Sequence, residues 1–460
     1  MKTIISMLWL RSRRAERDRQ AERDEGRTRN VGHLLMVESW VGSMSRLLPR
    51  AIGEGGHRFT FLTRDLHHYL SSGPVGETGP HPLLAAENVL SAPTNELPAL
   101  LEYTRRAHRL LGFDGVISAC DYYLPAAARI AEALGLPGPA PEAVTAACRK
   151  DATRERLASA GVPGPAFAVC RDGDELADAA ARLGYPLVIK PVDLCAGMLV
   201  RRVADERELA RAYQALAAFP VNARGQRRST AVLLEELLDG PEVSVETVSR
   251  GGACQVVGVT DKSLGGAPAF VETGHLFPSA LPPEAVRAAA DTAVSALAAL
   301  GLDQVVAHTE IRLTARGPRV VEVNPRPAGN RITELVRQVT GIDLPAAAVE
   351  LALGHEPDLT PGATGVGSAA IRFLLPEGPD LPSGGAELGA FDGTDQAASL
   401  PGVRELRLAE AGRPVTPATS NNDYLGHVLT TAPDGSAGER AGEALSLLRP
   451  RWAAPVGGAA

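Results

Sequence analysis

The chain has 460 residues, a formal net charge of −7, 45% hydrophobic and 22% charged residues, and five widely separated cysteines. This composition is typical of a soluble globular protein, and the length predicts roughly three domains of about 150 residues each. The sequence has no run of about 18 apolar residues and no CxxC pair, and its net charge is negative. These features argue against a transmembrane helix, a disulfide or zinc framework, and nucleic acid as the main partner.

Lysine is rare in this chain. Only four of the 47 basic residues are lysine: Lys2, Lys150, Lys190 and Lys262. The abundance of arginine, alanine, glycine and proline indicates a GC-rich coding bias. Lysine carries a compact charge on a flexible stem, whereas arginine presents a planar fork of donors. We therefore expect lysine at positions where the planar guanidinium of arginine cannot replace a compact ammonium group.

Residues 1–30 differ from the rest of the chain. Residues 11–30 contain eight arginines, five acids and no aliphatic side chain larger than alanine, which predicts a disordered segment or a solvated helix. The apolar residues 3–10 precede the positive charge, which is the reverse of a secretory signal. We interpret residues 1–30 as a disordered or non-native extension, for which an upstream start codon is one origin, and expect the fold to begin near Val31.

Strands and helices alternate from Val31 to about residue 140. Strands are predicted at residues 33–40, 57–63 and 115–120. Helices are predicted at residues 43–56, 96–111 and 125–135. This alternation is typical of a parallel sheet with helical crossovers. The glycines of residues 53–56 end a predicted helix, which favours a helix C-cap over a phosphate-binding loop.

The pattern changes after residue 140, where strands follow one another more closely. Helices are predicted at residues 145–161, 174–184, 206–219 and 284–301. Strands are predicted at residues 167–170, 186–192, 231–238, 242–250 and 253–262, followed by a hairpin of residues 305–314 and 319–327. Beyond Pro361 the chain is rich in glycine and proline, with short strands and a closing helix at residues 438–449. No internal repeat is present.

The predicted hairpin carries a set of oxygen ligands. Residues two apart in a strand share a face, which places Glu310 beside His308 and Glu322 beside Asn324. Mg²⁺ prefers such hard oxygen ligands, usually shared with substrate phosphates. A solvent-exposed polar face is the alternative. The rigid turn that follows Asn324, with Arg326 inside it, favours the metal site.

Two lysines and an acidic turn precede the hairpin. Lys190 ends an apolar strand, where it can direct its charge at a phosphate, and Lys150 opens the preceding segment. Residues 235–238 lead into a turn, after which Glu242 resumes a strand. A backbone edge flanked by acids suits the amino group of adenine and the hydroxyls of ribose.

This ordered set of residues resembles the ATP-grasp superfamily. The matching positions are Lys150, Lys190-Pro191, Glu235-Glu236, Glu310 and Glu322-Val-Asn324-Pro-Arg326, and the last motif is the most specific. The resemblance covers about residues 145–350, and the flanking parts fit the three-domain plan of the carboxylate–amine ligases in that superfamily. It implies an α/β and α+β protein with the following parts: an N-terminal Rossmann-like parallel-sheet domain (31–140), a small ATP-grasp subdomain (141–228), a large subdomain with the metal site (229–358) and a C-terminal α+β region (359–460).

The resemblance also implies a role for each matching residue. Lys150 and Lys190 would contact the phosphates of ATP, Glu235, Glu236, Leu237 and Leu238 would form the hinge around adenine, and Glu242 would hold the ribose. Glu310, Glu322 and Asn324 would bind Mg²⁺ or Mn²⁺. Arg326, assisted by Lys190, would be catalytic and would stabilise the phosphoryl group in flight and the acyl phosphate. Phosphoryl transfer depends mainly on such charge neutralisation and alignment.

One loop departs from the superfamily pattern. Residues 192–198 contain a single glycine, Gly197, where a Gly/Ser-rich phosphate loop is usual. Cys195 lies in this loop, and an incidental or buried cysteine is favoured over a nucleophile because the chemistry needs no thiol.

The candidate substrate residues are Lys262, His275 and Arg331. Lys262 and His275 flank a Gly/Pro-rich loop, and similar segments border the substrate pocket in amino-acid ligases of this superfamily. An ordinary surface loop is an equal alternative. Arg331 is expected to pair with a substrate carboxylate, with a role in helix packing as the alternative.

The function implied is an ATP- and Mg²⁺-dependent ligase that activates a carboxylate as an acyl phosphate and joins it to an amine. Among such enzymes the bacterial L-amino-acid ligases are favoured, which makes the partners small-molecule carboxylates and amines. A carboxylase or formyl-phosphate enzyme and a non-catalytic ATP-binding module are the alternatives. Nucleic acid and membrane are not expected as partners, and a cytoplasmic homodimer is expected. The sequence names neither of the two substrates nor the pathway.

Overall fold

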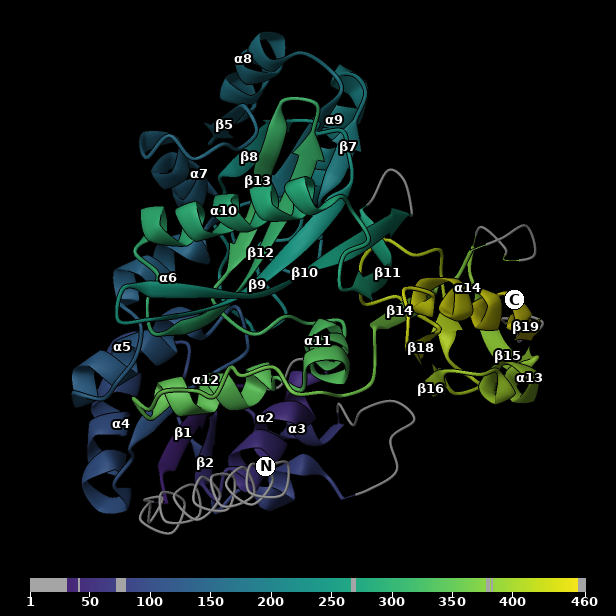
Figure 1. Ribbon diagram of the computed structural model, residues 1–460. Helices are drawn as coiled ribbons and strands as arrows, with labels where there is room; N and C mark the ends of the chain where they lie inside the picture. The colour runs from purple at the N-terminus through teal and green to yellow at the C-terminus, as the bar shows by residue number, and fades with distance from the viewer. Residues whose placement is uncertain are drawn as a thin grey trace, which may run out of the picture.

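The computed structural model describes residues 31–39, 42–71, 80–265, 270–377, 381 and 384–453. The extension expected at residues 1–30 lies outside the described residues. Figure 1 shows the N-terminal α/β part in purple and blue, a central sheet in teal and green, and the C-terminal part in yellow. Within the described part of the chain, none of the helices combines the length and the apolar character needed to cross a bilayer.

The N-terminal part is built on a four-stranded sheet in which every pair of neighbouring strands is parallel, as predicted. The strand order is β3 (Asn88–Ser91), β2 (Arg58–Thr63), β1 (His33–Val37) and β4 (Gly115–Ile117). Its helices are α2 (Met44–Glu54), α3 (Leu66–Ser71), η1 (Pro82–Ala85), α4 (Leu97–Leu111) and α5 (Leu124–Leu134). All five residues of β1 are buried, because helices cover both faces of the sheet. Gly55 caps the C-terminal end of α2, so the glycine cluster ends a helix as expected.

A second sheet is small and antiparallel. Its order is β5 (Phe167–Cys170), β8 (Val232–Glu236), β6 (Leu187–Pro191) and β7 (Arg201–Val203), and it packs against α8 (Gly173–Leu183) and α9 (Glu206–Ala217). The single helix predicted at residues 145–161 is wrong, because the chain forms α6 (Pro141–Ala147) and α7 (Lys150–Ser159). Arg149 is extended between them, and the backbone N–H of Lys150 donates to the carbonyl of Val192 at 2.9 Å. This break fixes Lys150 beside the strand that carries Lys190.

The central sheet has eight strands, and all neighbouring pairs are antiparallel. Its order is β13 (Gly317–Asn324), β12 (Val305–Thr314), β9 (Glu242–Arg250), β10 (Ala253–Gly265), β11 (Val271–Phe277), β14 (Ser368–Leu374), β18 (Gly426–Ala432) and β16 (Val403–Leu408). The long helix α10 (Pro283–Leu300) lies across this sheet (Figure 1). Ala289 and Ala293 of this helix are fully buried against valines of β9.

The segment around His275 is a strand, so the alternative of a surface loop there is wrong. β11 pairs with β10 on one side, where Lys262 faces His275, and with β14 on the other. Val271 and Phe277 at its two ends are buried. The sequence obscured this strand because polar residues and Gly274 occupy its middle.

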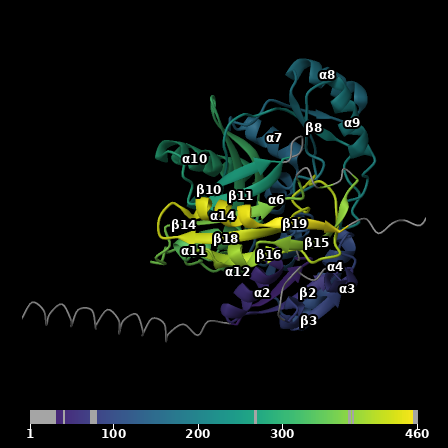
Figure 2. The ribbon, with the colours of Figure 1, turned by 90° about the vertical axis from the view of Figure 1, so that its right-hand side faces the viewer.

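The C-terminal part extends the central sheet and adds a smaller one. Strands β14, β18 and β16 continue the eight-stranded sheet, as seen from the side in Figure 2, where the yellow C-terminal elements face the viewer. The smaller sheet has the order β17 (Pro414–Val415), β15 (Ala386–Asp392) and β19 (Arg449–Ala453). Helices α13 (Thr394–Ser399) and α14 (Ala437–Leu447) complete this part.

Helices α11 (Ile332–Thr340) and α12 (Leu344–Ala352) join the N-terminal part to the central sheet. Leu335 on α11 and Leu344 on α12 are fully buried in a cluster with side chains of β12, β14 and β18. Val349 and Ala352 on the other side of α12 pack against α2 and the first sheet. The two helices therefore contribute side chains to two hydrophobic cores, one in the N-terminal part and one in the central sheet.

We expect Leu335→Ala to lower the free energy of unfolding by about 2–5 kcal/mol, because it leaves a cavity in a core that links three parts of the chain. Urea denaturation followed by tryptophan fluorescence and circular dichroism measures the change. The matched control is Leu110→Ala on α4, where the leucine is 86% exposed. This control should change the free energy of unfolding by less than about 0.5 kcal/mol. Equal effects of the two substitutions would contradict the proposed core.

Candidate active site

A cavity of about 530 Å³ lies where the N-terminal part, the small sheet, the central sheet and the C-terminal part meet. This volume is typical of pockets for small ligands. The cavity is lined by the residues predicted to bind nucleotide, metal and phosphoryl group: Lys150, Lys190, Glu235, Glu236, Leu237, Leu238, Glu242, Glu310, Glu322, Asn324 and Arg326. Lys262 also lines it. His275 and Arg331 are described residues that do not.

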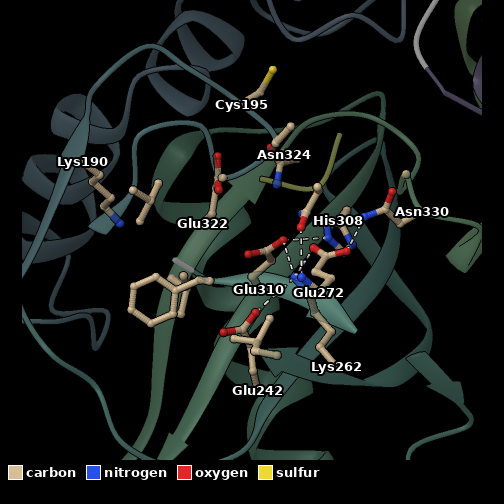
Figure 3. Close-up of a pocket in the computed structure, with 18 of the residues that line it drawn as sticks. Lys190, Cys195, Glu242, Lys262, Glu272, His308, Glu310, Glu322, Asn324 and Asn330 are labelled. Atoms are coloured by element: carbon tan, nitrogen blue, oxygen red, sulfur yellow. Dashed lines mark hydrogen bonds and ion pairs between the residues drawn. The ribbon is translucent and has the colours of Figure 1, made fainter. Parts of the chain in front are cut away.

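The hairpin places the predicted metal ligands together. In the register of β12 and β13, Glu310 pairs with Glu322 and His308 pairs with Asn324. Directly opposite residues of an antiparallel pair have side chains on the same face, with Cβ atoms about 5 Å apart. Figure 3 shows Glu310, Glu322 and Asn324 on the side of the sheet that faces the cavity.

This donor set suits Mg²⁺ that is shared with a phosphorylated substrate. Two carboxylates and one carboxamide supply only part of an octahedral shell, and phosphate oxygens and water would supply the rest. Among the described residues there is no group of three or more His, Cys, Asp or Glu side chains that could hold a metal ion by itself. The protein thus offers an incomplete shell of the right chemistry, which fits a metal that arrives with its nucleotide.

Lys190 lies in a buried ion-pair network. Its Nζ is 2.7 Å from Oε2 of Glu235, whose Oε1 accepts from Nε of Arg154 at 2.6 Å. Burial lowers the pKa of Lys190, and the Glu235 carboxylate only partly offsets this effect. Burial raises the pKa of Glu235, but Arg154 and Lys190 bring it below its ordinary value. Since both carboxylate oxygens are engaged, a contact to adenine in this region would come from the backbone of the following residues.

Glu236, Leu237 and Leu238, which follow Glu235, are half-buried and line the cavity. Glu236 exchanges hydrogen bonds with Ala166, and its carboxylate accepts from Arg316 at 2.7 Å. Leu237 and Leu238 lie beyond the end of β8 and line the cavity. The segment is therefore anchored at Glu236, and the backbone after it is outside the small sheet.

Lys150 connects the break between α6 and α7 to the hairpin. Its Nζ is 2.8 Å from Oε1 of Glu322 and donates to the carbonyl of Leu194 at 2.6 Å. Burial lowers the pKa of Lys150, and the Glu322 carboxylate more than offsets this, so the pKa is raised. Lys150 thus lies between a predicted metal ligand and the loop that follows β6.

Lys262 is surrounded by carboxylates from three other strands. Its Nζ is 2.6 Å from Glu310 on β12, 3.1 Å from Glu242 on β9 and 3.1 Å from Glu272 on β11 (Figure 3). The side chain is 1% exposed. Burial lowers the pKa of Lys262, but the three carboxylates raise it well above its ordinary value. Lys262 is therefore a buried cation that links the positions predicted for ribose and metal, Glu242 and Glu310, to Glu272.

His308 lies behind Glu310. Its Nδ1 is 2.8 Å from Oε1 of Glu246, and its Nε2 is 3.2 Å from Oε1 of Glu310. Burial lowers the pKa of His308, but Glu246 and Glu310 raise it to about 9. Burial raises the pKa of Glu310, but Lys262 and His308 lower it far below its ordinary value.

Asp121 is a site residue that the sequence analysis missed. It follows β4 in the N-terminal part, and its two oxygens accept from Nε and Nη2 of Arg326 at 2.7 and 3.0 Å. Burial lowers the pKa of Arg326, and Asp121 raises it above its ordinary value. The position of Asp121 in the sequence could have indicated this role. Ligands of parallel sheets bind beyond the carboxyl ends of the strands, and Asp121 closely follows the strand predicted at residues 115–120.

Glu272 is a second site residue that the sequence analysis missed, and the side chain of His275 contacts it. Glu272 accepts from Nδ2 of Asn330, and Nε2 of His275 lies 3.1 Å from its Oε2. Asn421, Asn422 and Tyr424 of the C-terminal part line the cavity nearby. His275 is 2% exposed and supports Glu272 from behind, so its predicted contact with the substrate is not what the structure shows.

Arg331 likewise points away from the cavity. It donates to Glu334 at 2.9 Å and to Glu405 at 2.6 Å, which ties α11 to β16. Its backbone is left-handed, with φ of 68°, at the N-cap position of α11. The structure therefore favours the packing alternative over a contact with the substrate carboxylate.

The loop after β6 is held in place without being rich in glycine. Gly197 has φ of 67°, and Ala196 has φ of 56°, a left-handed conformation that costs a non-glycine residue about 1 kcal/mol. Asp193 anchors the loop by accepting from the backbone N–H of Ser229 at 2.6 Å. Burial raises the pKa of Cys195 to about 12, so this thiol is a poor nucleophile, as expected.

Comparisons with known proteins agree with this arrangement. Sequence profiles match for the ATP-grasp N-terminal domain at residues 54–138, the ATP-grasp domain at residues 183–334 and the L-amino acid ligase C-terminal domain 2 at residues 381–453. The uncharacterized protein y4rH of Sinorhizobium fredii is 33% identical over 361 residues, which cover 77% of this chain and 72% of that protein. Carnosine synthase 1 of Homo sapiens is 32% identical over 267 residues, or 55% of this chain and 32% of that protein. The matched region therefore spans only about a third of the carnosine synthase.

A solved structure covers almost the whole chain. The crystal structure of an L-amino acid ligase from Bacillus licheniformis superposes with a TM-score of 0.75 and 25% identity, over 93% of this chain and 100% of that one. The chain belongs to the ATP-grasp superfamily, as the resemblance predicted. Within that superfamily it groups with the ATP-dependent carboxylate–amine ligases, and its C-terminal part is that of the L-amino acid ligases.

We expect Asp121→Asn to lower kcat about ten- to a hundredfold, because Arg326 loses the carboxylate that fixes its orientation and misplaced groups lose catalytic effect steeply. The KM for ATP should stay near its native value. Steady-state phosphate release measures both constants. Asp303→Asn, which alters a carboxylate that accepts from the backbone of Gly252 outside the cavity, is the control. A native kcat for Asp121→Asn would contradict the role of this contact.

Glu405 should make the protein sensitive to acid. Burial raises its pKa, but His427, Arg331 and Arg407 lower it to about 2. Such a carboxylate stabilises the fold above its unfolded-state pKa of about 4.3, and this contribution is lost as the pH falls towards about 2. We expect Glu405→Gln to have the lower Tm at pH 7 but to lose less Tm than the native protein between pH 5 and pH 3. Parallel Tm curves from scanning calorimetry would contradict this.

Proposed function

We propose that this enzyme uses ATP to activate the carboxylate of one amino acid and joins it to the amino group of a second, forming a dipeptide and releasing ADP and phosphate. The observation that carries the proposal is that one cavity holds two lysines for phosphates, the paired carboxylates Glu310 and Glu322, and the anchored Arg326. The match to an L-amino acid ligase domain and the similarity to a carnosine synthase support amino acids as substrates.

The nucleotide is proposed to lie between the small sheet and the hairpin. The backbone after Glu236 would contact adenine, and Glu242, at the start of β9, would contact the ribose. Lys150 and Lys190 reach the cavity from α7 and β6 and would meet the phosphates. Their compact ammonium groups can exchange a carboxylate partner for a phosphate oxygen without the loss of a planar geometry.

Glu310, Glu322 and Asn324 would hold Mg²⁺ at the hairpin. Mg²⁺ bound there would neutralise charge on the transferred phosphoryl group and align it. Arg326 would donate to the equatorial oxygens of that group, and Asp121 would keep its guanidinium oriented. The substrate carboxylate attacks the γ-phosphorus, ADP leaves, and the amine then displaces phosphate from the acyl carbon, so the net products are the amide, ADP and phosphate.

The amino-acid end of the cavity is proposed to lie beside β11 and the C-terminal part. Glu272 supplies the negative charge that suits a substrate ammonium group, and Lys262 supplies a positive charge close to it. Asn330 and Tyr424 complete this wall. A cytoplasmic location and a homodimer stay predictions.

The test is a panel of amino-acid pairs incubated with the purified protein and Mg²⁺-ATP. We expect phosphate release that requires two amino acids, and a product whose mass is the sum of both minus one water. Chelation of Mg²⁺ should abolish this release. Absence of any amino-acid-dependent phosphate would contradict the proposal, whereas ADP formation that depends on bicarbonate or formate would support a carboxylase or formyl-phosphate enzyme.

Arg326→Ala separates catalysis from binding in the same assay. It should still bind ATP, because Arg326 is proposed to act on the group in flight, and should lower kcat about a hundredfold or more, as removal of a preorganised donor does. Isothermal titration with a non-hydrolysable ATP analogue measures the binding. Unchanged turnover would contradict the catalytic role of Arg326.

A further inference from the structure

A fully buried carboxylate lies on the metal face of the central sheet, beside His308. Glu246 on β9 is 0% exposed and is not among the residues that line the cavity. Its Oε1 accepts from Oγ of Ser244 at 2.8 Å and faces Nδ1 of His308 at the same distance. Within the described part of the chain its Oε2 has no hydrogen-bond partner. The cost of burying a carboxylate can exceed the gain from its ion pair, and here one oxygen has no partner in the part of the chain that the structure describes, so this position calls for a functional explanation.

His308 connects this hidden carboxylate to Glu310. In the register of β12 and β9, His308 stands opposite Glu246, and Glu310 stands opposite Ser244, so the side chains share one face. Nε2 of His308 is 3.2 Å from Oε1 of Glu310. The same oxygen is 2.6 Å from Nζ of Lys262. Nε2 of His308 on β12 and Nζ of Lys262 on β10 therefore converge on one oxygen of the predicted metal ligand (Figure 3).

We propose that Glu246 and His308 are positioning residues that orient the metal ligand Glu310 for Mg²⁺. This inference rests on the proposed function for the role of Glu310. Glu246 fixes the orientation of the imidazole from the neighbouring strand β9, and the imidazole fixes the carboxylate of Glu310 at the cavity wall. Outer partners of this kind commonly change metal affinity by about 10–100-fold when they are removed.

A purely structural role for the pair would have a different signature. If Glu246 and His308 only satisfy each other's hydrogen bonds, substituting them lowers stability and leaves metal affinity unchanged. A pair that orients Glu310 affects metal affinity in the folded protein, because an unfixed carboxylate must first lose rotamer freedom to bind. Metal affinity in the absence of turnover therefore distinguishes the two roles.

The experiment uses Mn²⁺ as a paramagnetic probe with the full-length protein and ADP. Electron paramagnetic resonance measures free Mn²⁺ in a titration and gives the dissociation constant without any reaction. Glu246→Gln keeps the shape of the side chain and removes its charge, whereas His308→Ala removes the link itself. We expect both to raise the dissociation constant about tenfold or more, while circular dichroism and Tm show a folded protein.

Two controls bracket the result. Ser249→Ala alters a buried hydroxyl on the same strand that has no hydrogen-bond partner among the described residues, and it should leave the dissociation constant within twofold of native. Glu310→Gln removes the ligand charge and should weaken Mn²⁺ binding more than either positioning variant.

The outcomes separate this inference from the proposed function. If folded Glu246→Gln and His308→Ala bind Mn²⁺ like the native protein, the positioning role is overturned, whatever Glu310→Gln shows. If Glu310→Gln also binds normally, the inference falls together with the assignment of the ligand. Amino-acid-dependent phosphate release by the unsubstituted protein reports on the ligase activity independently of both results.

Discussion

The buried ammonium of Lys262 holds together the carboxylates on which the site depends. Glu310, Glu242, Lys262 and Glu272 come from β12, β9, β10 and β11, which are four consecutive strands of the central sheet. Three carboxylates in such a small buried space would repel one another without a cation between them. Removing one partner of a buried ion pair lowers the free energy of unfolding by about 3–5 kcal/mol. The carboxylates therefore require Lys262 at this position, and Lys262 requires the strand order that brings them around it.

Lysines and arginines occupy different kinds of position in this cavity, and their chemistry explains why. Lys262 meets three acceptors from different directions, which a rotating ammonium can satisfy and a planar fork cannot. Arg326 donates two parallel hydrogen bonds to Asp121, and Arg312 donates to Glu242 and to the carbonyl of Gly240. Lys150, Lys190 and Lys262 all line the cavity, so the rarity of lysine in the sequence was a useful guide to the site.

The sequence predicted those parts of the site that depend on local periodicity. Alternation along two strands was enough to place Glu310, Glu322 and Asn324 on one face, since their pairing needs only a short hairpin. Asp121 could not be assigned in this way, because its partner Arg326 lies 205 positions further along the chain. Its contact depends on how the N-terminal sheet packs against the central one.

Two misjudged substrate residues have the same physical origin. His275 was judged from a polar stretch, but β11 is held in the sheet by backbone pairing on both sides and by buried residues at its ends. Arg331 was judged from its neighbourhood in the sequence, but it has a left-handed backbone and its side chain donates to Glu405. Register and backbone handedness at single residues are set by tertiary contacts, which a pattern of residue types does not encode.

The continuous hydrogen bonding between β11 and β14 bears on how this protein can be divided. A chain ending near Pro361 would lose β14, β18 and β16. The side of β11 that pairs with β14 would then be an unpaired sheet edge, which favours pairing with other molecules. Such a fragment would also lose Asn421, Asn422 and Tyr424 from the wall of the cavity. The C-terminal part therefore cannot be removed without opening the central sheet and the cavity. To exchange substrate preference between relatives, β14, β18 and β16 would have to be transferred together with the residues that face the ligand.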